Sequence, residues 1–138
     1  MSPSAPLSNL AYPNTPYSFK VCQWLHPELP LPRAMKNPIS IVQTTLPGDM
    51  SEPEVGEWIF SKISVKLAKC AHRIRVQSMY QWDEKIEFSP EWRIQFKTDP
   101  VMKPELIRAI QSDHPYDVPQ ILAWDADSTK DYFNWVQA

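Results

Sequence analysis

Prolines are crowded into the first part of this chain. The 138 residues include fifteen prolines against two glycines, and eight of the prolines precede Ile39. Proline fixes its own φ and has no amide hydrogen, so this density excludes both a long helix and a central strand. We therefore expect residues 1–38 to form an extended or disordered arm and residues 39–138 to form one folded domain.

The composition excludes several classes of protein. Hydrophobic residues make up 43% of the chain and charged residues 22%, as in ordinary globular proteins. A formal net charge of −2 gives no global attraction to nucleic acid, and no apolar run is long enough to span a bilayer. Nothing resembles a secretory leader, and two cysteines are too few for a disulfide framework. We expect a cytoplasmic protein with no nucleic-acid or membrane partner; a single Cys22–Cys70 bridge stays open.

The first half of the predicted domain contains a strand and a helix. The β-branched run 39–45 ends at Pro47-Gly48, which is typical of a strand followed by a turn. Ser51 and Glu54 have the spacing of a capping box. Apolar residues then recur at helical spacing and predict a helix that runs to about Lys69, with this stripe: Val55, Ile59, Ile63, Leu67 and Cys70.

A hairpin and a further strand are predicted next. Residues 74–82 are rich in β-formers, Asp83-Glu84 makes the hairpin tip, and residues 85–88 return. Pro90 predicts a bulge or an edge position. Beyond it, apolar and polar residues alternate strictly over 92–97, which predicts a strand with one buried and one solvated face.

The last part of the chain predicts a helix, a strand and a short helix. Pro104 opens a helix that must end before Pro115, residues 120–124 form a core strand, and Ser128 caps the terminal helix. The element order predicts an α+β, ferredoxin-like split βαβ sandwich, with two helices on one face of an antiparallel sheet plus a short C-terminal helix. The other face stays open, and self-association is the usual way to cover it.

The segment His114-Pro115-Tyr116-Asp117-Val118-Pro119 is stiff before any tertiary contact forms, because two prolines four apart restrict it. A stiff loop that holds His, Tyr and Asp beside a strand suits a binding pocket or a subunit contact. A rigid turn that feeds a core strand is the alternative.

Several motifs together resemble one family. The loop matches the HPY(E/D)VP motif of the CutA divalent-cation-tolerance proteins, and Tyr80–Glu87 is similar to their aromatic, acidic hairpin. The resemblance covers roughly residues 39–137, and separated motifs in the right order are more specific than any one alone. The other matching segments are Leu67–Ala71, Lys97-Thr98 and Asp131–Trp135.

The resemblance implies a non-enzymatic homotrimer with a role in tolerance of divalent cations, chiefly copper. The sheets of the three subunits would pack inward and cover the open face. The alternative is a binding module like the PII signalling proteins, which bind small effectors in clefts between subunits. No catalytic motif is visible in the sequence, and with only two glycines we expect no phosphate-cradling loop.

The residues at the family's proposed copper positions differ in this chain. The resemblance places Gln43, Asp113 and Gln120 there, and two amides with one carboxylate are poor copper ligands. His114 is the fourth candidate ligand, although a hydrogen bond to the backbone is its simpler role. The candidate ligand-binding cleft contains Lys97, His114, Tyr116 and Asp117, and the expected trimer interface contains Tyr80, Trp82, Trp92 and Ile94.

Overall fold

The computed structural model describes residue 34 and residues 36–138. Most of the expected arm, including Cys22, lies outside the described residues, so the form of the arm and the Cys22–Cys70 bridge stay predictions. Within the described part, Lys36 and Asn37 contact the segment before the C-terminal helix: the Lys36 amide donates to Asp127 and Ser128 Oγ donates to the Asn37 carbonyl.

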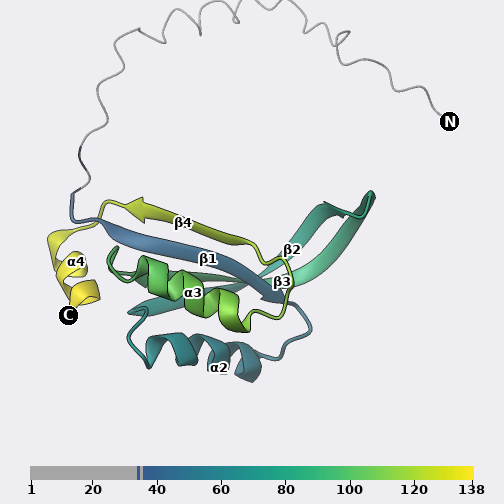
Figure 1. Cartoon of the computed structure of the whole chain (residues 1–138), viewed down its shortest axis with the longest axis horizontal. Helices are drawn as coiled ribbons and strands as arrows, with labels where there is room; N and C mark the ends of the chain where they lie inside the picture. Colours follow the sequence, from purple (N-terminus) through teal and green to yellow (C-terminus); the bar gives the residue numbers. More distant parts are fainter. Residues whose placement is uncertain (1–33, 35) are drawn as a thin grey trace, which may run out of the picture. The chain divides into compact units, whose positions relative to one another are not determined.

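Along the described residues, four strands and three helices follow one another in the predicted order (Figure 1). The strands form one antiparallel sheet with the order β2-β3-β1-β4, which confirms the predicted ferredoxin-like α+β fold. Within the described residues, no helix is both long and apolar enough to cross a membrane. The elements are β1 (Ile39–Pro47), α2 (Glu52–Ile63), β2 (Cys70–Trp82), β3 (Lys85–Thr98), α3 (Lys103–Asp113), β4 (Ile121–Ala126) and α4 (Lys130–Gln137).

Helices α2 and α3 cover one face of the sheet and enclose the core. Side chains alternate between the two faces along a strand, so every second residue of β1 and β3 points under the helices. Directly paired residues share a face, as in Val42↔Phe96 and Leu46↔Trp92. The core consists of Val42, Leu46, Val55, Ala68, Trp92, Ile94, Phe96, Leu106 and Ile110.

The opposite face of the sheet carries large apolar side chains that remain exposed. On β4, Leu122 and Trp124 pair with Gln43 and Ile41 of β1 and share this face with them. Trp124 is 40% exposed and Leu122 is 49% exposed. We refer to this surface, which also includes Ile74, Tyr80 and Trp82 of β2, as the open face.

Helix α2 begins as predicted but ends early. The amide of Glu54 donates to Ser51 Oγ at 3.3 Å and the Ser51 amide donates to Glu54 Oε2 at 2.7 Å, which completes the capping box. The helix ends at Ile63 rather than near Lys69, because Lys66 adopts a left-handed φ of 65° and the Leu67 amide bonds back to the Lys62 carbonyl. Cys70 therefore starts β2 instead of extending the helical stripe.

Strands β2 and β3 form a long hairpin without a bulge. Every residue pairs in register from Cys70↔Lys97 to Trp82↔Lys85, so β2 starts earlier than expected and Pro90 does not interrupt β3. Pro90 lies one residue beyond the last pair between β3 and β1, where β3 has only β2 as its neighbour. A missing amide hydrogen costs little at such a position. The hairpin continues past the end of β1 and projects from the rest of the sheet (Figure 1).

The turn into α2 fits closely against this hairpin. A Cβ placed on Gly48 would lie 2.2 Å from the Pro90 carbonyl oxygen, so only glycine is accommodated there.

At the C-terminal end, α4 has Thr129 at its N-cap position without a side-chain cap. The predicted cap is therefore wrong, because the Ser128 hydroxyl bonds to backbone carbonyls instead.

We predict that Glu84→Gly stabilises the fold. Both residues of the hairpin turn have positive φ, 48° at Asp83 and 61° at Glu84, and a side chain at such an angle costs about 1–2 kcal/mol. Part of the gain is lost because glycine makes the unfolded chain more flexible, so the free energy of unfolding should rise by about 0.5–1 kcal/mol in urea titrations. Glu87→Gly, within β3, is the control and should lower stability; a loss with Glu84→Gly would contradict the prediction.

Candidate functional site

The loop between α3 and β4 brings together residues from both sides of the sheet. It begins at His114 directly after α3 and reaches Gln120 just before β4. His114 contacts Thr44, whose side chain shares the helix-covered face with Ile94. Tyr116, two residues later, contacts Glu91. Because side chains alternate along a strand and the next residue, Trp92, lies beneath the helices, Glu91 lies on the open face. The stiff loop therefore holds the two rings against each other, with 5.5 Å between their centroids, while their hydrogen bonds reach residues of opposite faces of the sheet.

The hydrogen bonds of His114 define its tautomer. The Thr44 hydroxyl donates its single hydrogen to the Gln120 carbonyl at 2.7 Å, so its oxygen accepts at the 2.9 Å contact with His114 Nε2. The ring hydrogen of His114 is therefore on Nε2. His114 Nδ1 in turn accepts from the Tyr116 amide at 3.1 Å. Both ring nitrogens are thus engaged, and a metal ion would have to displace one of these bonds.

Burial keeps the His114 ring neutral. It lowers the pKa of the imidazole, and this effect outweighs the Thr45 backbone contact and the nearby charges of Asp113 and Glu91, which act in the opposite direction. The Trp58 ring meets the imidazole edge-on, with 6.1 Å between ring centroids. The geometry fits a structural link between loop, sheet and helix, which is the simpler role anticipated for this residue.

Tyr116 binds a buried carboxylate. Its hydroxyl donates to Glu91 Oε2 at 2.9 Å, and the Glu91 residue is only 7% exposed. Burial raises the pKa of the tyrosine hydroxyl well above its ordinary value, and the hydrogen bond to Glu91 and the charge of that carboxylate add to the effect. Tyr116 therefore stays protonated and acts as a donor at all ordinary pH values.

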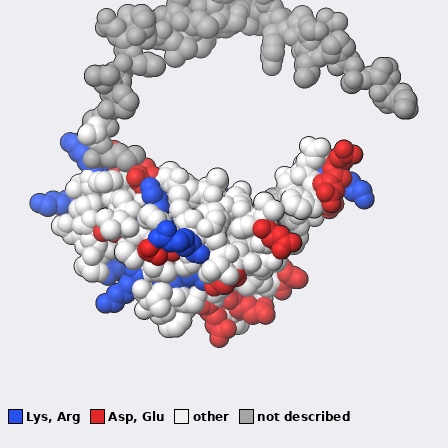
Figure 2. All heavy atoms as spheres, in the orientation of Figure 1, with Lys and Arg blue, Asp and Glu red and all other residues white. Residues whose placement is uncertain are grey.

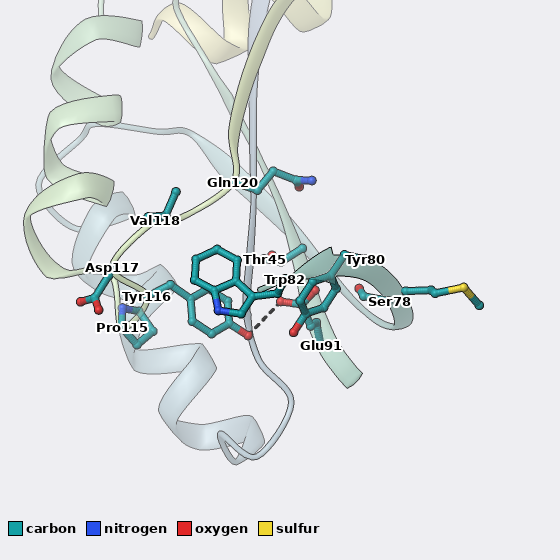
Figure 3. Close-up of a pocket in the computed structure, with 11 residues that line it drawn as sticks. Thr45, Ser78, Tyr80, Trp82, Glu91, Pro115, Tyr116, Asp117, Val118 and Gln120 are labelled. Carbon is teal, nitrogen blue, oxygen red and sulfur yellow. Dashed lines mark hydrogen bonds between the residues drawn. The ribbon is translucent and has the colours of Figure 1, made fainter. Parts of the chain in front are cut away.

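A cavity of about 630 Å³ lies between this loop and the projecting hairpin (Figure 3). Its volume is within the range of small-molecule sites. The Trp82, Tyr80 and Tyr116 rings lie around it with Glu91 in Figure 3. The full lining is Thr45, Ser78, Met79, Tyr80, Trp82, Glu91, Pro115, Tyr116, Asp117, Val118 and Gln120.

The three candidate copper positions are not brought together. Asp113 lies against α2, where Lys62 binds Oδ2 at 2.5 Å and the Trp58 indole donates to Oδ1 at 3.1 Å. Gln43 lies on the open face and its Oε1 accepts from Gln95 at 2.8 Å. Gln120 lines the cavity. Over the described residues, no group of three or more His, Cys, Asp or Glu side chains is placed to hold a metal ion.

The residues of the predicted ligand-binding cleft divide between two places. Tyr116 and Asp117 line the cavity, whereas Lys97 lies six residues from Glu91 along β3 (97 − 91 = 6). At about 3.3 Å per residue this separates the two positions by roughly 20 Å. Lys97 is buried, and its Nζ lies 2.7 Å from His72 Nδ1. Beside it on β2, the Sγ atom of Cys70 lies 3.6 Å from the Tyr132 hydroxyl.

Two of the four expected interface residues face the wrong way. Trp92 and Ile94 are 7% and 0% exposed and belong to the core beneath the helices, so they cannot meet another subunit. The strict alternation in β3 was read correctly, but its apolar face turns toward α2 and α3. Tyr80 and Trp82 are 45% and 54% exposed and lie on the open face, so their role in an interface stays a prediction.

Comparison with known proteins identifies the family. The sequence profile of the CutA1 divalent ion tolerance protein matches residues 40–138. The chain belongs to the CutA1 family. The CutA protein of Thermococcus kodakarensis is 35% identical over 97 residues, which cover 70% of this chain and 90% of the relative.

Solved CutA1 structures agree with the fold. The Ehrlichia chaffeensis protein, a divalent ion tolerance protein, superposes with a TM-score of 0.65 at 30% identity over 75% of this chain and 94% of its own. The Oryza sativa CutA1 gives a TM-score of 0.65 at 27% identity and covers 72% of this chain and 90% of its own. The family resemblance drawn from the loop and hairpin motifs is therefore confirmed.

Two important residues of this CutA1 chain were not anticipated from the sequence. Glu91 was not singled out, although extending the alternation of 92–97 by one position places it on the same face as Arg93. Lys62 was not expected to hold Asp113, because nothing in the helix pattern indicates where the end of α3 will lie. Both partners depend on contacts between segments distant in sequence.

We predict that His114→Gln costs more stability at pH 7.5 than at pH 5.5. Because the folded pKa of His114 is lowered, the unfolded chain binds the proton first as the pH falls. The stabilisation is thus complete above the unfolded pKa of about 6.5 and declines below it.

The expected cost of the substitution is about 1–3 kcal/mol at pH 7.5. It should be measured by urea unfolding at one fixed protein concentration, because assembly would shift apparent stability. A cost that stays constant or grows on acidification would show that the ring is not held neutral.

Proposed function

We propose that this protein acts as a non-enzymatic homotrimer in the cellular response to divalent cations, in the cytoplasm. Membership of the CutA1 family supports the cation role, and relatives with that family name are divalent cation tolerance proteins. The observation that carries the assembly is the open face, where large apolar side chains on both edge strands, β2 and β4, have no cover in the described chain.

The open face has the character of an interface core. It combines two tryptophans and a tyrosine with aliphatic residues, and large exposed apolar patches mark contact sites. The hairpin that projects past β1 adds apolar side chains on its other side, including Met79, Ile86 and Phe88. A two-stranded ribbon is marginal by itself, so packing against neighbouring copies would stabilise it.

The donors available for a cation differ from the expected set. Gln43 and Gln120 offer neutral amide oxygens, and Asp113 is already engaged by Lys62, so these residues do not fit copper. Cys70 and His72 are the soft donors of the open face, two positions apart on β2. Lys97 occupies Nδ1 of His72, which leaves Nε2 for a ligand. Such a pair is half a site, and a trimer would supply the rest from another subunit.

A small-ligand module of the PII type is the second candidate. The cavity between loop and hairpin supports it, because a volume of about 630 Å³ accommodates a small molecule. Its lining contains Glu91 and Asp117 and no Lys or Arg, which disfavours an anionic effector there.

Assembly is tested with Trp124→Asp. A charge placed in a dry interface is costly, so the molar mass by light scattering should fall from that of a trimer toward that of a single chain. Phe60→Asp is the matched control, since Phe60 is 68% exposed on α2 and away from the open face. A folded Trp124→Asp protein that keeps its trimeric mass would contradict the assembly.

Cation binding is tested by calorimetric titration of the assembled protein with Cu²⁺. We expect saturable binding at micromolar or tighter affinity, weakened at least about tenfold by His72→Ala because a soft ligand is lost. Gln43→Ala is the control and should change nothing. Absence of binding, or loss with Gln43→Ala alone, would contradict this part of the proposal.

A further inference from the structure

Two charged side chains on the open face of β3 have no partner of opposite charge in the described chain. Glu91 and Arg93 are two positions apart on this strand, so both point away from the face on which Trp92 is buried. Across residues 36–138, no ion pair includes either of them. Charges withdrawn from water are costly unless an opposite charge accompanies them, so each would gain from a partner outside the single chain.

The carboxylate of Glu91 keeps one oxygen free for a donor. Its Oε2 accepts from the Tyr116 hydroxyl at 2.9 Å, and within the described chain no hydrogen bond reaches Oε1. The residue is only 7% exposed, but it lines the cavity between loop and hairpin, so a side chain that enters this cavity can reach it. Because Lys and Arg are absent from the described lining residues, a cationic donor has to come from another molecule.

Arg93 has the matching deficit. Its side chain is half-buried, and its Nε is enclosed without a hydrogen-bond partner among the described residues. It pairs across the strands with Ile74, which is 53% exposed, so the guanidinium lies among apolar side chains of the open face. The other basic side chains of this face are accounted for, because Lys97 contacts His72 and Lys85 is exposed beside the hairpin turn.

The charges are arranged in a way that suits a ring of copies. In a closed ring each chain meets its two neighbours through different surfaces, so a side chain of one kind contacts a side chain of another kind. Figure 2 shows acidic side chains gathered on the side of the molecule that carries the hairpin, while basic ones dominate the side of α4. A chain that offers both a carboxylate and a guanidinium on its open face can satisfy one neighbour with each.

We propose that Glu91 of each chain binds Arg93 of the neighbouring chain in the assembled protein. The guanidinium enters the cavity and donates to Oε1, while the Tyr116 hydroxyl keeps its bond to Oε2. The pair rests on the proposed assembly and adds a charged contact to an apolar interface. Apolar surfaces alone can meet in several arrangements, whereas a charge pair selects the arrangement that brings opposite charges together and rejects those that bring like charges together.

The first test is the rate of subunit exchange between isotope-labelled and unlabelled full-length trimers, measured by native mass spectrometry. Removing one partner of a buried charge pair speeds dissociation, so Arg93→Gln should accelerate exchange at least about tenfold. In a Glu91→Gln background the same change should matter less than about twofold, because the opposite charge is already gone.

Glu87→Gln is the control background for this comparison. Glu87 is an exposed carboxylate on the same face of the same strand, where it pairs with Tyr80. In this background Arg93→Gln should keep its full effect, because the carboxylate of Glu91 is still present. Equal effects of Arg93→Gln in the natural and the Glu91→Gln backgrounds would overturn the proposal.

The second test asks whether the pair joins two different subunits. Arg93→Glu chains bring only carboxylates to the contact and Glu91→Arg chains bring only guanidinium groups, so mixed trimers should outnumber trimers of either kind alone when the two are combined. Glu91→Lys replaces Glu91→Arg if circular dichroism shows that the latter is unfolded. Arg93→Glu combined with Glu87→Arg is the matched control and should give no excess of mixed trimers.

The outcomes separate this pair from the assembly on which it rests. A statistical mixture of charge-reversed chains, or a mixture dominated by pure trimers, would overturn the pair while the natural protein remains a trimer. A natural protein that is not a trimer by light scattering would overturn the assembly itself, and the pair with it.

Discussion

One-sided burial of the sheet is the constraint on which the rest of this structure depends. Strands β1 and β3 lie in the middle of the sheet, and alternate residues of both turn their side chains beneath α2 and α3. Each large apolar side chain among them, such as Phe96 or Leu46, contributes about 1.5–3 kcal/mol by leaving water. Because two helices can cover only one face, the other residues of the same strands remain on a surface that needs a partner. The fold of one chain and its tendency to associate therefore have the same origin.

The element order was predictable because local patterns agree with the fold. The capping box at Ser51, the turn at Asp83-Glu84 and Pro104 in the first turn of α3 each act through neighbours in sequence. The end of α2 was not predictable, because the apolar stripe continues to Leu67 although Lys66 turns to a left-handed conformation. The face of β3 was misassigned for a related reason: alternation separates two faces but does not say which one the helices cover.

The candidate site was predictable in its loop and not in its partners. Two prolines indicate a stiff segment, and the structure shows that the segment bonds His114 and Tyr116 to residues of opposite faces of the sheet. Their partners Thr44 and Glu91 lie on strands β1 and β3, 70 and 25 residues away along the chain. The tertiary arrangement alone brings them together. The same arrangement separates Gln43 from Asp113, which the family resemblance had grouped.

The register of β1 has a consequence for how this chain is synthesised. Ser40 pairs with Thr98 on one side and with Asp125 on the other, so both partners of β1 emerge long after it. At about 5–20 residues per second, the ribosome completes the first partner several seconds after β1. During that time an apolar, β-branched strand has no edge to join, and contacts this distant in sequence also form slowly. The nascent chain is thus most exposed to unwanted pairing in its first strand, and that hazard ends only when β3 has been made.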